Sequence, residues 1–124
     1  MTDYLSAILD RKRRENDRRR RHVAAMKPVE RPTDSARGRE GVAALRRTEG
    51  EPPSVMAELK FRSPSAGVIR TKRPGEAVRV AKAYENGGAS VVSVLADGPG
   101  FDGSPLVVRR VARAVDVPLL FEEF

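Results

Sequence analysis

The chain has 124 residues, a net charge of +7, 40% hydrophobic and 5% aromatic residues, and no cysteine. This length allows at most one domain, with a core built mainly from Val, Ala and Leu. The composition excludes disulfides and thiolate metal sites, the single His22 cannot anchor a metal site by itself, and no apolar run reaches the roughly 20 residues of a membrane span.

Residues 3–21 are predicted to form a helix that is apolar only at its start. Its apolar stripe has helical spacing and consists of Tyr4, Leu5, Ile8 and Leu9. Thr2 is a suitable N-cap residue for this helix. Beyond Asp10 the stripe ends in the run RKRRENDRRRR, so this part is expected to face solvent or an anionic partner.

The excess positive charge belongs to the first part of the chain. Residues 1–50 carry 14 Lys or Arg and 8 Asp or Glu, whereas residues 51–124 carry 10 and 9. Nucleic-acid binding by Arg11–Arg21 is one interpretation, and a solvated helix face is the other. The second is favoured, because no aromatic residue interrupts the run and no known nucleic-acid-binding module accompanies it. His22, after the run, is expected to be exposed.

Residues 27–41 are predicted to be a linker, because prolines and glycines alternate there with charges. One or two helical turns are expected at Gly41–Arg47, and the segment 49–53 ends this part of the chain. We therefore divide the chain into a basic helical N-terminal extension with its linker, residues 1–53, and a second part, residues 54–124.

The second part is predicted to alternate strands with helices. The expected elements are a strand at 55–60, a loop at 63–74, a helix at 76–86, a strand at 90–95, a loop at 96–104, a helix from Pro105 and a strand at 119–124. Gly87 and Gly88 follow the first of these helices and can form a C-cap with positive φ. This order predicts an α/β fold with a parallel sheet and crossover helices.

Glu58 and Lys60 are the strongest candidates for a functional site. Alternation along a strand places them on one face, near the strand end and just before the turn Ser63-Pro64-Ser65. If the strand is central, burying two charges there is costly, which favours a site. The alternative is a structural ion pair. The glycines at 98–103 match neither a P-loop nor a dinucleotide-binding fingerprint, so they are only weak evidence for a phosphate site.

Four segments resemble the first part of the indole-3-glycerol phosphate synthase family. They are MAELKFRSPSAGVI, the helix end AYENGGA, SVVSVLADGPGFDGS and VPLLFEEF, in this order. The helix DYLSAILDRKRRE is similar to the family's N-terminal extension. The resemblance implies the N-terminal part of a (β/α)8 TIM barrel of about 250 residues, with about three parallel strands and two crossover helices, and catalytic groups at the strand ends.

The resemblance also implies an activity and its residues. The family closes the indole ring and decarboxylates 1-(2-carboxyphenylamino)-1-deoxyribulose 5-phosphate in tryptophan biosynthesis, a cytoplasmic reaction without metal or organic cofactor. Glu58 is implied to orient the site and Lys60 to pair with anionic groups of this sugar-phosphate substrate and take part in acid steps. The implied substrate-binding positions are Ser63, Pro64, Phe101, Gly103 and Phe124.

Glu122 departs from the family pattern, which has a catalytic lysine at this position. A carboxylate there is normally ionised at neutral pH and repels an anionic substrate. The chain also ends after three expected strands, before those that carry the family's general-base groups. We therefore expect this chain alone to be weakly active or inactive. The alternative is a non-catalytic barrel fragment that pairs with another chain through its open sheet edge. No membrane association is expected.

Overall fold

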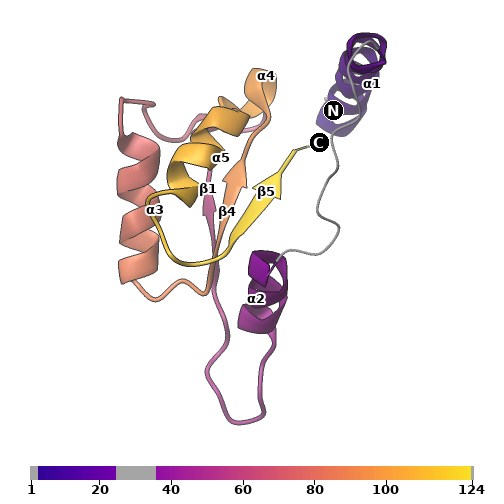
Figure 1. The fold of residues 1–124 in the computed structure, drawn as a ribbon. Helices are drawn as coiled ribbons and strands as arrows, with labels where there is room; N and C mark the ends of the chain where they lie inside the picture. The colour runs from indigo at the N-terminus through magenta and orange to yellow at the C-terminus, as the bar shows by residue number, and fades with distance from the viewer. Residues whose placement is uncertain (1–2, 25–35, 124) are drawn as a thin grey trace. The chain divides into compact units, whose positions relative to one another are not determined.

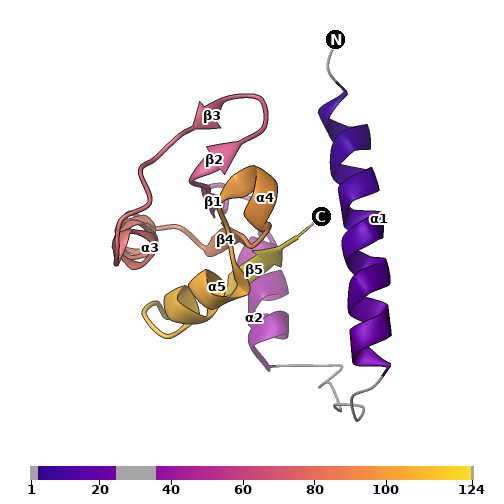
Figure 2. The same cartoon turned by 90° about the horizontal axis from the view of Figure 1, so that it is seen from above.

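The computed structural model describes residues 3–24 and 36–123, which form two compact units that we treat separately. The first unit contains α1 (Tyr4–Val23), and the second contains the other described helices and strands, all within residues 36–123 (Figures 1 and 2). Among the described residues, no helix combines the length and the apolar character needed to cross a membrane.

Helix α1 confirms the first predicted helix but has a different N-cap. The carboxylate of Asp3, not Thr2, accepts a hydrogen bond from the backbone N–H of Ser6 at 3.1 Å, and Thr2 lies outside the described residues. The helix continues through the charged run although its apolar stripe has ended. Arg11 and Lys12 each pair with Glu15 at 3.1 Å, at the spacings of four and three residues that stabilise a helix.

Helix α2 (Ala36–Leu45) begins five residues before the predicted helical turns. The prediction of a linker at 27–41 was therefore wrong for residues 36–41, which are helical, and residues 27–35 lie outside the described part. Its first turns contain alanine, arginine and glutamate, which are good helix formers. At Gly41 an added Cβ atom would lie 3.4 Å from the Cβ of Pro118, an ordinary van der Waals distance, so α2 lies next to the segment that leads into the last strand.

The second unit contains a parallel sheet with the strand order β1-β4-β5. The strands are β1 (Met56–Leu59), β4 (Val91–Leu95) and β5 (Leu119–Glu122), and the helices α3 (Glu76–Asn86) and α5 (Pro105–Ala112) connect them (Figure 1). This confirms the predicted order of strands and helices. Gly87 is the C-cap of α3 with φ −79°, and the positive φ occurs at Gly88, at 88°.

The hydrophobic core lies between the sheet and the helices α3 and α5. All five residues of β4 are buried, as expected for the middle strand. The core cluster consists of Leu59, Phe61, Val80, Ala81, Ala89, Val92, Val94, Val107, Val111 and Val115. Because side chains alternate along each strand, Glu58, Ser93 and Glu122 lie on the face of the sheet opposite this core.

Two predicted loops contain short elements. An antiparallel hairpin of β2 (Arg62–Ser63) and β3 (Gly67–Val68) overlaps the start of the segment 63–74, and Gly67, the first residue of β3 after the turn, has a φ of 68°. The glycine-rich segment contains α4 (Gly98–Phe101), which is fixed by the buried side chain of Phe101. Neither element has enough residues to show a period in the sequence.

Candidate active site at the carboxyl ends of the strands

Glu58 and Lys60 form an ion pair at the carboxyl end of β1. The Lys60 Nζ lies 2.6 Å from Oε1 of Glu58, and the side chains are 27% and 43% exposed, respectively. In the described sheet β1 is an edge strand. The high cost of burying two charges applies to a central strand and therefore does not apply here. The charges therefore remain partly hydrated, and the pair is available to a ligand at moderate desolvation cost.

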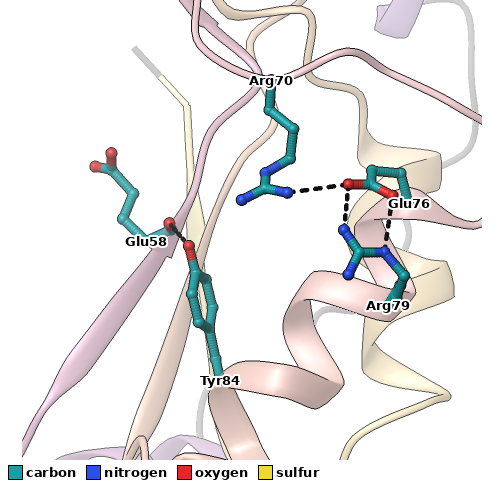
Figure 3. Close-up of polar contacts among 5 residues, drawn as sticks. All are labelled: Glu58, Arg70, Glu76, Arg79 and Tyr84. Atoms are coloured by element: carbon teal, nitrogen blue, oxygen red, sulfur yellow. Dashed lines mark hydrogen bonds and ion pairs between the residues drawn. The ribbon is translucent and has the colours of Figure 1, made fainter.

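Tyr84 on α3 fixes the backbone of this strand. Its hydroxyl donates a hydrogen bond of 3.1 Å to the carbonyl oxygen of Glu58. Figure 3 shows that the Glu58 carboxylate points away from Tyr84. The backbone of Glu58 is therefore held by Tyr84, while its charged side chain extends away from Tyr84. The tyrosine thus couples the position of the charged pair to the packing of α3.

Phe101 lies beside the ammonium group of Lys60. The ring centroid is 5.8 Å from Nζ, within the range of cation–π attraction, and the phenylalanine is only 5% exposed. Gly103 follows α4, and its N–H donates to the carbonyl oxygen of Asp97 at 2.8 Å. An apolar ring and a cation are therefore adjacent at this end of the sheet.

Ser63 and Pro64 lie in the hairpin turn after β1. Ser63 is buried, and its hydroxyl accepts a hydrogen bond from the N–H of Ala66 at 3.0 Å, whereas Pro64 is half-buried. The hydroxyl of Ser63 thus holds its own turn. Because β2 contacts α4, the turn is next to the segment that carries Phe101 (Figure 2).

Glu122 ends β5 and is held by a residue that the sequence analysis missed. The hydroxyl of Ser93 on β4 donates a hydrogen bond of 2.9 Å to Oε2 of Glu122. Ser93 is almost fully buried, and nothing in the local sequence pattern connects it with a residue 29 positions away. Phe124, the last predicted pocket residue, lies outside the described residues.

The connection from the hairpin to α3 contributes further contacts that were not predicted. Glu76 accepts hydrogen bonds from Arg79 at 2.6 Å and from Arg70 at 3.1 Å (Figure 3). The hydrogen bonds from Arg79 and then Arg70 lower the pKa of Glu76 to about 2. Lys72 donates to the backbone carbonyl of Asp102 at 2.7 Å, which ties this connection to the segment after α4. Of these contacts, only the Glu76–Arg79 ion pair could be predicted from the sequence, because the two residues are three positions apart on a predicted helix.

The arrangement combines one ammonium group with two carboxylates, from Glu58 and Glu122, and an aromatic ring. Lys60 can donate hydrogen bonds to an anionic group, and Phe101 can contact an apolar ring. Within residues 3–24 and 36–123, no three His, Cys, Asp or Glu side chains are grouped so that they could hold a metal ion.

Comparison with known proteins identifies the family. Residues 5–124 match the family model described as indole-3-glycerol phosphate synthase. The chain is 40% identical over 134 aligned residues to the indole-3-glycerol phosphate synthase of Neisseria meningitidis serogroup B, with 100% of this chain and 47% of that protein covered. It is 42% identical over 123 residues to the protein of that name from Chlorobium phaeovibrioides, with 98% and 46% covered.

A third relative supports the same assignment over a shorter region. The indole-3-glycerol phosphate synthase of Rhodopirellula baltica is 47% identical over 70 residues, which cover 56% of this chain and 26% of that protein. The chain spans about half the length of the curated relatives that it matches over its full extent. It belongs to the indole-3-glycerol phosphate synthase family, and its parallel sheet with crossover helices is the N-terminal part of that family's (β/α)8 barrel.

Proposed function

We propose that this chain contributes the first strands of an indole-3-glycerol phosphate synthase, which closes the indole ring and decarboxylates 1-(2-carboxyphenylamino)-1-deoxyribulose 5-phosphate in tryptophan biosynthesis. The proposal includes a cytoplasmic location. The observation that carries it is the Glu58–Lys60 ion pair of 2.6 Å at the carboxyl end of β1, in a chain whose family is established. Carboxyl ends of the strands are where barrel enzymes of this fold have their active sites.

Each site residue has a role in this proposal. Lys60 pairs with an anionic group of the sugar-phosphate substrate, and Glu58 orients the lysine through the ion pair. Phe101 contributes an apolar wall beside the cation, and Gly103 allows the segment after α4 to approach the end of β4. Ser63 and Pro64 shape the turn next to α4, and Phe124 is proposed as a further part of the apolar wall.

Glu122 makes the chain a poor catalyst in this proposal. Its carboxylate replaces a cationic acid, and the hydrogen bond from the Ser93 hydroxyl holds this carboxylate at the end of β5. Loss of one positioned general acid typically lowers the rate by a factor of about 10² to 10⁴. We therefore propose that this chain by itself is weakly active or inactive.

A turnover assay with the carboxyphenylamino-deoxyribulose phosphate tests the proposal, with the relative from Neisseria meningitidis as reference. We expect turnover by this chain to be at least about 100-fold lower than that of the reference. Turnover close to the reference would contradict weak activity. Calorimetric titration with the same substrate tests the site separately: Glu122→Lys should tighten binding, and Lys60→Gln should weaken it. Binding that neither substitution changes would contradict the assigned roles.

A second candidate function is a non-catalytic fragment that pairs with another chain. Within the described residues, β1 and β5 each pair with one strand only, so each has an unpaired edge. Large apolar side chains are exposed on these strands, with Leu120 44% and Phe121 48% exposed. Strands with such edges associate readily with further strands. A soluble monomer with cooperative unfolding would count against this candidate.

A further inference from the structure

A cavity lies on the core side of the sheet, outside the candidate active site. Its volume is ≈ 310 Å³, and its walls come from Phe61 after β1, the segment before α3, the first turn of α3, and α5. Phe61 lines this cavity, whereas Lys60, the residue before it, contacts Glu58 on the other face. The cavity and the Glu58–Lys60 ion pair therefore have no residue in common.

The cavity has an apolar floor and a cationic rim. The floor includes Phe61 and Val107, which are 3% and 8% exposed, together with Ala77. The rim carries the exposed side chains of Lys72, Arg73 and Arg110. In the described part of the chain, none of the residues that line the cavity is acidic.

The rim keeps hydrogen-bonding capacity for an anion. The nearest acidic side chain in the sequence, Glu76, is held by Arg70 and Arg79 and does not line the cavity. Lys72 donates one hydrogen bond to the carbonyl of Asp102, and an ammonium group has three donors. Arg110 adds a planar guanidinium, which can bind a carboxylate through two parallel hydrogen bonds or stack on an aromatic ring.

We propose that this cavity binds a small aromatic carboxylate. The aromatic ring would lie on the floor formed by Phe61 and Val107, and the carboxylate would face Lys72 and Arg110. The volume of ≈ 310 Å³ is at the lower end of the range of about 300–1,000 Å³ for ligand pockets, which suits a ligand of one or two rings. The proposal does not depend on the proposed function, since no residue of the Glu58–Lys60 pair lines the cavity.

Titration of the ¹⁵N-labelled chain with 1-naphthoate at low salt tests this proposal by nuclear magnetic resonance. We expect saturable shifts of the amide signals of Lys72, Gly75, Ala77 and Val107. The neutral isostere 1-naphthalenemethanol should bind at least about tenfold more weakly, because it lacks the charge-assisted hydrogen bonds. Inorganic phosphate, which has no apolar part, should also bind at least about tenfold more weakly.

Two arginines of α5 provide a matched pair of variants. Arg110 lines the cavity, whereas Arg109, its exposed neighbour, does not. Arg110→Gln should weaken naphthoate binding about tenfold, the effect of losing a hydrogen bond to a charged group, and Arg109→Gln should leave it within about twofold. Lys72→Gln is a second variant at the rim and should also weaken binding.

Several results would overturn the proposal. They are the absence of saturable shifts, equal affinity for the neutral alcohol or for phosphate, equal effects of Arg110→Gln and Arg109→Gln, and shifts confined to residues outside the cavity. Lys60→Gln separates this proposal from the proposed function, because that variant should bind naphthoate normally while it binds the sugar-phosphate substrate more weakly.

Discussion

Gly103 shows, at the scale of a single residue, how closely the segment after α4 approaches the sheet. A Cβ atom added at Gly103 would lie 2.1 Å from the carbonyl oxygen of Leu95 and 2.8 Å from the carbonyl carbon of Ala96. These are backbone atoms at the end of β4, which cannot move without shifting the strand. The position therefore requires glycine for close approach, and its φ lies outside the positive range.

Gly103→Ala should lower the free energy of unfolding by about 2 kcal/mol, because the added methyl group displaces the backbone of β4. Gly98→Ala is the matched control: an added Cβ there would have its nearest neighbour at 3.7 Å, and we expect a change within about 0.5 kcal/mol. Urea denaturation of both variants measures the difference. Equal effects of the two substitutions would contradict the close approach at Gly103.

At the scale of one element, α5 shows that burial determines the energetic weight of a side chain more than its size. Val111 is fully buried against the core, whereas Leu106, on the same helix, is 53% exposed. Val111→Ala should lower the free energy of unfolding by about 2 kcal/mol, from lost burial and the cavity left behind. Leu106→Ala removes more atoms but should cost about 0.5 kcal/mol or less. Denaturation midpoints that place Leu106→Ala as the more damaging change would contradict the observed orientation of α5.

The start of α3 should make part of the stability dependent on pH. The arginines beside Glu76 lower its pKa from 4.5 to about 2 in the folded chain. A depressed pKa stabilises the folded state fully above the unfolded-state pKa, and this contribution is lost as the pH falls through the folded-state pKa. The stability difference between the chain and Glu76→Gln should therefore be constant above about pH 5 and shrink between 4.5 and about 2.

Urea denaturation at several pH values between 2 and 7 measures this difference. Lys82→Gln, an exposed change on the same helix, is the control and should leave the pH profile of stability unchanged. If the free energies of unfolding of Glu76→Gln and of the unchanged chain varied with pH in parallel down to pH 2, the ion pairs with Arg70 and Arg79 would contribute nothing to stability.

At the scale of the whole molecule, the open edges of the sheet should control self-association. Phe121 on β5 is 48% exposed, and Phe121→Lys places a charge where an added strand would pack. This variant should weaken concentration-dependent association in sedimentation velocity experiments. Val68→Lys is the control, because Val68 is 68% exposed on the separate β2–β3 hairpin. A chain that is monomeric at every concentration, with or without Phe121, would contradict this prediction and the fragment-pairing candidate.

The sequence by itself determined the order of strands and helices in the second part, because apolar spacing, the proline at the start of α5 and the glycines after α3 are local properties. It also placed Glu58 and Lys60 on one face, since side chains alternate along any strand. The same local logic could not find α4 or the hairpin, which are too short to show a period, and it chose Thr2 where Asp3 caps α1.

Only the tertiary structure decided which distant residues meet. The hydrogen bond from Ser93 to Glu122 and that from Lys72 to Asp102 join residues 29 and 30 positions apart, through strand pairing and loop packing. The edge position of β1 likewise depends on the strand order. A central strand would bury the Glu58–Lys60 pair at a high cost, whereas the pair in the structure is partly hydrated. The physical reason is that spacing along a chain sets the direction of each side chain, whereas its neighbours and its exposure are set by how the elements pack.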